Sequence, residues 1–108
     1  MERLLAAEPR PTAVAVWSLV SAVGALAAAR RRSVRVPEEL SFVAFHDAPI
    51  AAYLEPPLTT VHMPLGEMAE RSVDCLLRVV AGQRAASIVV QTPPELVARA
   101  STARAAAA

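Results

Sequence analysis

Cysteine and net charge are both scarce in this sequence. Cys75 is the only cysteine, which excludes an internal disulfide framework and a zinc site made of cysteines alone. The formal net charge is +1, so the composition gives no case for a nucleic-acid-binding surface, which needs a clustered excess of basic residues. The one basic run, Arg30-Arg31-Arg32, fits the solvated end of a helix.

Hydrophobic residues, by contrast, are plentiful. They make up 55% of the 108 residues, against 19% charged residues, so we expect one small folded domain with a modest core rather than a disordered tail. The uncharged run Ala13–Ala29 has the character of a signal-peptide core or a weak membrane span. Its alanine-rich composition and the acidic Glu2 and Glu8 upstream argue against both. We therefore expect a cytoplasmic chain without membrane association, with export as the minority alternative.

Hydrophobic periodicity predicts strands that alternate with helices. The first half of the chain holds a predicted strand at 12–16, a helix at 19–32 that Ser18 can cap, and a strand at 41–45. The helix has apolar residues on nearly every face, so it needs cover on more than one side, by a sheet and, as one option, by a second subunit. Ser33 stands where such a helix more often ends on glycine.

The second half continues the alternation. Its predicted elements are a short helix over 48–54, an extended segment at 59–63, a long helix over 65–81, and strands at 87–91 and 95–100. Asp47 can cap the short helix, and Gly82 ends the long one. Residues 1–11 are expected to be irregular, the chain to fray from Ser101, and 103–108 to form a tail. This order of elements predicts an α/β layered fold.

One stretch carries a resemblance to a known family. Residues 35–61 have the sequence RVPEELSFVAFHDAPIAAYLEPPLTTV. This resembles the sensor-domain signature of LacI/GalR-type transcriptional regulators, RVP-x-D/E-L/I-S-V-V-G-F-D-D followed by PPLTT. Residues 10–14, 23–26 and 96–102 fit the same family pattern. The resemblance therefore covers the chain from about 10 to 102.

The resemblance implies a periplasmic-binding-protein-like fold of type I, with two Rossmann-like subdomains joined by three chain crossings. Residues 12–58 and 95–102 would belong to the C-terminal subdomain, and 65–90 to the N-terminal subdomain. The segments 59–64 and 92–94 would be two of the crossings. The chain would then hold incomplete sheets from both subdomains, as the C-terminal part of a sensor domain. The helix-turn-helix head of the family would be absent from it.

The resemblance also implies ligand contacts from loops at the strand ends. By position, the candidate effector-binding residues are Trp17, Ser18, His46, Asp47 and Met63. The family usually has Asn-Asp where this chain has Ser18-Leu19, and that aspartate typically hydrogen-bonds the effector, which Leu19 cannot do. The family often has glutamine where this chain has Met63. Trp17 could stack on a ligand ring, and packing beside the strand at 12–16 is an equally good alternative.

A second set of positions points to self-association. Under the resemblance, the candidate dimer-interface residues are Leu19, Val23, Leu26 and Tyr53. For Tyr53, the plain alternative is a half-buried helix residue. We expect a homo-oligomer.

Catalytic chemistry finds little support in the sequence. His46 and Asp47 are adjacent at a strand end, so their side chains point to opposite sides and rarely form an acid–base dyad. Ser18 lies outside any Gly-x-Ser-x-Gly elbow. His46, Asp47 and His62 lack the spacing of metal ligands. We therefore expect no enzyme activity, no cofactor and no metal.

The leading hypothesis is the C-terminal part of the effector-binding and dimerisation domain of a LacI/GalR-type repressor. Its expected partners are a sugar-like or nucleoside-like effector in complete relatives, and operator DNA only through a missing helix-turn-helix. Two alternatives stay open. The chain could be a truncated remnant, or the product of a mis-called start, without independent activity. It could also be a dimerisation module that pairs with full-length subunits.

Overall fold

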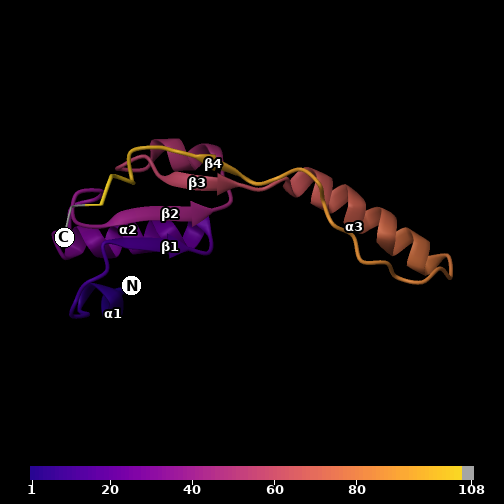
Figure 1. Cartoon of the computed structure of the whole chain (residues 1–108), viewed down its shortest axis with the longest axis horizontal. Coiled ribbons are helices and arrows are strands. Elements are labelled where there is room, and N and C mark those ends of the chain that lie inside the picture. The colour runs from indigo at the N-terminus through magenta and orange to yellow at the C-terminus, as the bar shows by residue number, and fades with distance from the viewer. Residues whose placement is uncertain (106–108) are drawn as a thin grey trace. The chain divides into compact units, whose positions relative to one another are not determined.

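The computed structural model describes residues 1–105, and the chain forms two compact units. Unit 1 comprises residues 1–62 and the chain from 96 onward, and unit 2 comprises 63–95. The chain therefore crosses between the units twice, after His62 and after Glu95. The helices and strands of both units are labelled in Figure 1. That the two units correspond to two subdomains stays a prediction.

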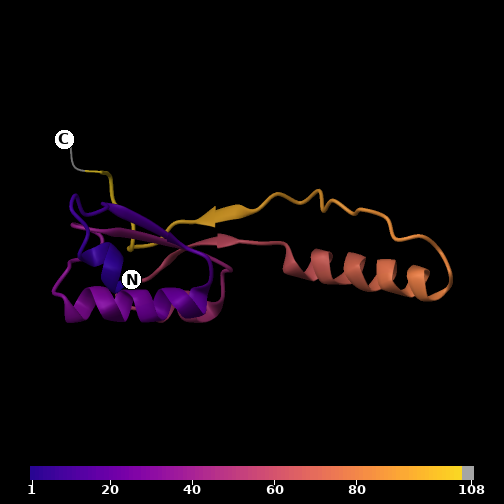
Figure 2. The ribbon, with the colours of Figure 1, turned by 90° about the horizontal axis from the view of Figure 1, so that it is seen from below.

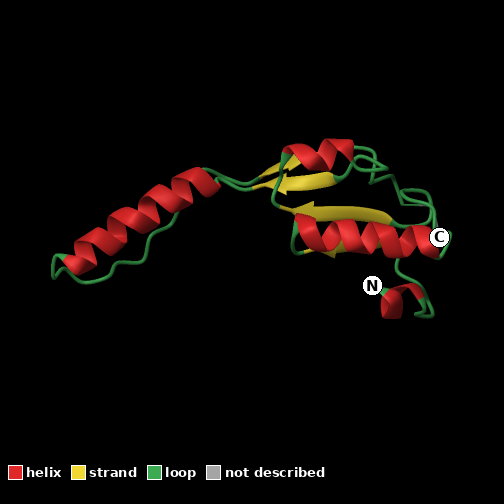
Figure 3. Cartoon of the chain, turned by 180° about the vertical axis from the view of Figure 1, so that it is seen from behind, coloured by secondary structure: helices red, strands yellow, loops and turns green. Residues whose placement is uncertain are grey.

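Unit 1 is a sheet packed against a helix. The sheet has the order β1-β2-β3-β4, with β1 (Ala13–Val16), β2 (Ser41–Phe45), β3 (Thr59–His62) and β4 (Glu95–Val97). The first three strands are parallel, and Figure 2 shows β4 running against β3, so the sheet is mixed. Parallel neighbours need a long crossover, and helix α2 (Leu19–Arg31) supplies it between β1 and β2. In Figure 3, α2 lies along the sheet. The predicted α/β fold is confirmed.

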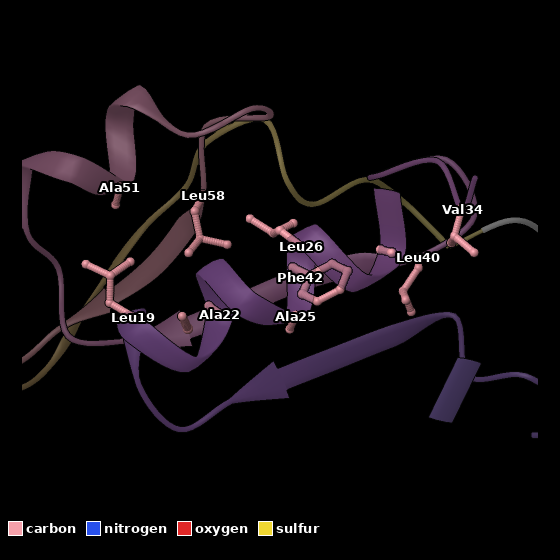
Figure 4. Close-up of a cluster of buried hydrophobic side chains, with 11 residues drawn as sticks. Leu19, Ala22, Ala25, Leu26, Val34, Leu40, Phe42, Ala51 and Leu58 are labelled. Atoms are coloured by element: carbon pink, nitrogen blue, oxygen red, sulfur yellow. The ribbon is translucent and has the colours of Figure 1, made fainter. Parts of the chain in front are cut away.

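The core of unit 1 lies between α2 and the sheet. Along β2, Phe42 and Ala44 are fully buried, whereas Val43 and Phe45 on the opposite face are only half-buried. Alternate residues of a strand point to opposite faces, so one face of the sheet carries the core. The buried apolar cluster, shown in Figure 4, comprises Leu19, Ala22, Ala25, Leu26, Ala29, Val34, Leu40, Phe42, Ala44, Ala51 and Leu58.

Both ends of α2 follow from local chemistry. At the start, the Ser18 side chain accepts a hydrogen bond from the backbone N–H of Ser21 at 3.2 Å, which confirms the predicted cap. Beyond the end, Ser33 has φ +54° and takes the position that glycine usually fills, as predicted. The N–H of Val34 then donates to the carbonyl of Ala29 at 3.0 Å, which satisfies one of the last helical carbonyls.

The turn before β2 is fixed by one carboxylate between two arginines. Glu39 accepts hydrogen bonds from the Arg35 Nε at 2.9 Å, the Arg35 backbone N–H at 3.2 Å, and the Arg10 guanidinium at 3.0 Å. These bonds, with the Arg35 side chain first, lower the pKa of Glu39 to about 2. The cluster lies at the amino end of β2, opposite the end at which the strand carries His46.

Unit 2 contains helix α3 (Leu65–Val80) and a returning segment. Gly82, with φ +86°, ends the helix as predicted. Glu67 and Arg71 lie 4.0 Å apart on the polar face of the helix. Much of the apolar face of the helix is exposed, at Leu65, Met68, Val73, Leu76, Leu77 and Val80.

Several local predictions were wrong. Residues 87–91 are not a strand, because no strand of unit 2 is available to pair with them, and strand propensity alone does not satisfy backbone hydrogen bonds. The expected irregular segment 1–11 contains a one-turn helix, α1 (Glu2–Leu5), whose Glu2 pairs with Arg32 at 2.7 Å. Ser101 does not fray, since it is fully buried.

The short helix after β2 also differs from its prediction. It is a 3-10 helix, η1 (Pro49–Tyr53), preceded by Ala48 without a side-chain cap, so Asp47 is not its cap. The Asp47 carboxylate is used elsewhere, as described below. The last strand, predicted over 95–100, covers only Glu95–Val97. Residues 106–108 of the predicted tail lie outside the described residues. In the described part of the chain, no helix is long and apolar enough to cross a membrane.

Candidate functional site

The carboxyl ends of the three parallel strands meet at one edge of the sheet in unit 1. After β1 comes Trp17-Ser18, after β2 comes His46-Asp47, and β3 ends at His62. Ligands of open α/β sheets bind at this kind of edge, outside the carboxyl ends of the strands. We call these five residues the carboxyl edge. Four of the five predicted effector-binding residues are therefore brought to one edge, and Met63, the fifth, is the first residue of unit 2.

Trp17 presents an unusually open aromatic surface. Its side chain is 81% exposed, although tryptophan normally buries most of its large apolar area. The indole contacts the ring of Phe45, with the ring centroids 5.2 Å apart and the planes tilted by 40°. Trp17 thus packs against the end of β2 rather than into the core, and much of its surface remains available for contact.

The Ser18 hydroxyl is committed to helix α2. It accepts from the Ser21 N–H and donates to the Ser21 Oγ at 2.9 Å. A hydroxyl that accepts at the helix start and donates to a neighbouring hydroxyl has no base beside it to activate it as a nucleophile.

His46 forms the sharp bend at the end of β2. It has φ +70°, in the left-handed region that non-glycine residues seldom adopt. Its backbone N–H donates to the carbonyl of Val61 at 3.0 Å, which ties the bend to β3. The imidazole is exposed. A strained backbone conformation of this kind persists only where the surroundings fix it, and it often marks a functional position.

The Asp47 carboxylate forms an ion pair with Arg99, a residue far away in the sequence. Its Oδ1 lies 2.9 Å from the Arg99 Nη1 and accepts a hydrogen bond from the Thr60 Oγ1 at 2.6 Å. The Arg99 hydrogen bond, then that of Thr60, holds the pKa of Asp47 below its ordinary value, with a smaller contribution from the charge of His62. Asp47 is therefore an ionised structural carboxylate at this edge and not a poised acid.

Sequence reasoning missed Arg99, which pairs with Asp47, and Ser101, which bonds Phe42 and Thr59. Arg99 and Ser101 belong to the segment 96–102 that matched the family pattern, but no role followed from the match. Arg99 also donates from Nη1 to the Thr60 Oγ1 and to the carbonyl of Leu58, both at 2.8 Å. The signal that could have found Arg99 is a single arginine in an otherwise apolar strand-like segment, opposite an acid at a strand end.

Ser101 and Thr59 form the other half of this polar network. The Ser101 Oγ donates to the carbonyl of Phe42 at 2.7 Å and accepts from the Thr59 N–H at 2.8 Å. The Thr59 Oγ1 donates to the Arg99 carbonyl at 3.2 Å and accepts from the Arg99 N–H at 2.9 Å. Thr102 adds a hydroxyl contact to Thr59 at 3.0 Å. The segment after β4 is thereby fixed to β2 and β3 by side chains.

The four candidate dimer-interface residues differ in exposure. Leu19 and Leu26 lie in the core of unit 1, whereas Val23 is 40% exposed and Tyr53 is 85% exposed. Val23 and Tyr53 line one shallow groove between α2 and η1, together with Leu54. The dimer role of these residues stays a prediction. Among the described residues, no three His, Cys, Asp or Glu side chains are placed to hold a metal ion.

The comparisons with known proteins agree on one family. The family model for the periplasmic binding protein-like domain matches residues 1–102. The HTH-type transcriptional regulator MalR of Streptomyces coelicolor is 43% identical over 94 residues, which are 87% of this chain and 27% of the regulator. The HTH-type transcriptional repressor PurR of Mannheimia succiniciproducens is 36% identical over 101 residues, which are 94% of this chain and 30% of the repressor.

Solved structures give the same result. A LacI family transcriptional regulator from Mycobacterium smegmatis matches with a TM-score of 0.81 and 41% identity, over 87% of this chain and 34% of that chain. One from Lactobacillus casei, solved with bound sucrose, matches with a TM-score of 0.71 and 30% identity, over 94% of this chain and 38% of that chain. The chain thus spans less than two fifths of the length of these relatives. It belongs to the periplasmic binding protein-like domain family, in the form found in the sensor domains of LacI-family transcriptional regulators.

Proposed function

We propose that this chain is the C-terminal part of the effector-binding and dimerisation domain of a LacI/GalR-type repressor, and that its carboxyl edge contacts a small-molecule effector. The observation that carries the proposal is the open indole of Trp17, held against Phe45 at the end of parallel strands, where α/β sheets bind ligands. In a complete relative, effector binding would shift a conformational equilibrium and change operator binding through a separate helix-turn-helix.

The effector class follows from what the edge offers. An exposed aromatic face stacks on a sugar ring or on a nucleobase, and the exposed imidazole of His46 can donate or accept a hydrogen bond. Asp47 is neutralised by Arg99, so the edge presents little net charge. These features support an uncharged, ring-shaped effector, sugar-like or nucleoside-like.

A chimeric repressor tests the proposal. The stretch of Streptomyces coelicolor MalR that matches this chain is replaced by the corresponding residues, and repression of a reporter is measured with sucrose, maltose or inosine as probes. We expect repression without a probe and relief by at least one of them. A chimera that represses but is relieved by none, with Trp17 fluorescence unchanged by all three, contradicts the proposal.

Trp17 variants of the chimera locate the contact. Loss of aromatic stacking costs about 0.5–1.5 kcal/mol, so Trp17→Ala should raise the half-effective probe concentration by roughly two- to thirteenfold and leave repression intact. Trp17→Phe, which keeps an aromatic ring, should restore most of the response. Equal responses in all three proteins would show that Trp17 does not touch the effector.

A second candidate function is self-association through α2 and η1. Val23 is 40% exposed and Tyr53 is 85% exposed, and the two line one groove between α2 and η1. Exposed apolar side chains that lie together commonly mark an interface. Light scattering on the purified chain should give the mass of a dimer, and Tyr53→Glu the mass of a monomer. Val89→Glu, a matched change at an exposed apolar residue of unit 2, should leave the dimer intact. A dimer that survives Tyr53→Glu rejects this surface.

We infer that the chain is not an enzyme and acts in the cytoplasm. The relatives are transcriptional regulators. Two of the groups considered for catalysis are engaged in structural contacts, the Ser18 hydroxyl at the helix start and the Asp47 carboxylate on Arg99.

A further inference from the structure

We infer that Arg99 is a positioning residue for the carboxyl edge: from the segment that follows β4, its guanidinium holds Asp47 and thereby the bend at His46. The functional part of this inference rests on the proposed effector role of the edge. The structural part stands on the hydrogen bonds of unit 1 alone.

The guanidinium of Arg99 is shared among three oxygen atoms of unit 1. Its Nη1 lies 2.8 Å from the carbonyl of Leu58, 2.8 Å from the Thr60 Oγ1 and 2.9 Å from the Asp47 Oδ1. The side chain is 17% exposed and that of Asp47 is 21% exposed, so the pair is largely withdrawn from water. A charged pair in such surroundings is much less screened than one on the surface.

The arginine is fixed at its backbone as well as at its tip. Its N–H and carbonyl both pair with the Thr59 Oγ1, and Ser101, two residues later, is fully buried against Phe42 and Thr59. A long side chain held at both ends has lost most of its rotamer freedom. The charge of Arg99 is therefore held at one position, beside Asp47 in the bend between β2 and η1.

Because Asp47 is fixed by Arg99, the backbone next to it at the carboxyl edge is held in place as well. Asp47 follows His46, whose left-handed backbone needs outside support, and Phe45 before that bend contacts the indole of Trp17. Without the guanidinium, the carboxylate would keep the Thr60 hydroxyl but lose the cation that lies 2.9 Å from it. We expect the bend to relax and the Trp17–Phe45 contact to change.

Trp17 is the sole tryptophan of the chain, so its fluorescence makes this testable in the 108-residue chain. Arg99→Met keeps the aliphatic stem and removes the charge. We expect an unchanged far-UV circular dichroism spectrum, and a Trp17 emission and acrylamide quenching that differ from those of the parent, because the contact with Phe45 changes. Arg99→Lys should restore part of the change, since an ammonium can reach one of the three oxygens. Arg35→Met, which removes an arginine from Glu39 at the other end of β2, should leave Trp17 as in the parent.

Each outcome decides the inference. Trp17 emission and quenching identical to the parent in Arg99→Met, with helix and strand content kept, overturn it. If Arg99→Met loses its circular dichroism, the same measurement on Thr60→Val decides, because this variant removes only one hydroxyl from the Arg99–Asp47 pair. A Trp17 signal in Thr60→Val no different from that of the parent overturns the inference in that case.

The chimera separates this inference from the proposed function. If the MalR chimera responds to a probe, Arg99→Met should raise the half-effective concentration toward that of Trp17→Ala and keep repression, and an unchanged value would overturn the positioning role. If the chimera responds to no probe while Trp17 still shifts in Arg99→Met, the proposed function fails and the structural role of Arg99 stands.

Discussion

Removing the hydroxyl of Ser101 should strongly destabilise unit 1. The hydroxyl is fully buried and satisfies two backbone groups, the carbonyl of Phe42 and the N–H of Thr59, at 2.7 and 2.8 Å. In Ser101→Ala both groups stay buried without this partner. Each such loss costs about 1–3 kcal/mol, so two give about 2–6 kcal/mol, and we expect about 3 kcal/mol. That is a large part of the about 5–15 kcal/mol that stabilises a small domain.

Urea unfolding followed by circular dichroism and by Trp17 fluorescence measures this loss. Ser41→Ala is the matched control in the neighbouring strand position, where the hydroxyl accepts one exposed hydrogen bond from the N–H of Ala103 at 3.2 Å. It should cost less than about 1 kcal/mol. Amide hydrogen exchange adds a local test, since the Thr59 N–H should lose protection in Ser101→Ala. A loss no larger than that of Ser41→Ala would refute the assignment of both backbone groups to this hydroxyl.

Three further predictions follow from Asp47 and from the ends of α2 and α3. The lowered pKa of Asp47 stabilises the folded chain above its ordinary pKa of 3.8, and this contribution is lost as pH falls through the lower folded value. The difference in unfolding free energy between the parent and Asp47→Asn should therefore be largest near neutral pH and shrink below pH 3.8. Protonation of Glu39 in acid affects the stability of both proteins equally, so it cancels from this difference. A difference that is constant with pH would contradict the prediction. Ser33 has φ +54°, so Ser33→Gly should raise the unfolding free energy by about 0.5–1 kcal/mol. Gly82 has φ +86° with open space around it, so Gly82→Ala should lower the stability of α3 through backbone strain alone. Thermal unfolding of both variants checks these two predictions.

Local sequence patterns predicted the elements whose causes are local. The strand Ser41–Phe45 was predicted with its observed bounds, because its alternating buried residues and the turn before it are encoded within a few positions. The Ser18 cap and the helix end at Ser33 were predicted for the same reason. Each of these features depends on residues no more than about one helical turn away.

The features that sequence reasoning missed depend on distant residues. Asp47 was predicted to cap the next helix, but the stronger partner is Arg99, and no local pattern contains both residues. The strand predicted at 87–91 has the right composition but no partner in unit 2. The strand predicted over 95–100 stops at Val97 because Arg99 and Ser101 leave the sheet ladder to bond Thr59 and Phe42. The sequence alone could not show which distant polar group each of these side chains binds in the folded chain.

The link between Thr59 and Ser101 has a consequence for the order of folding. The two residues are 42 positions apart in the chain, and a contact of such sequence separation forms late because the loop between them must first be closed. During synthesis, which proceeds at about 5–20 residues per second, β1, β2 and α2 are complete several seconds before Ser101 is made. In that interval the N–H of Thr59 and the carbonyl of Phe42 lack their partner, and the nascent sheet is open at β3. Residues 95–101 therefore decide when the edge of β3 becomes covered, and a chaperone that covers β3 until then would be most useful during that interval.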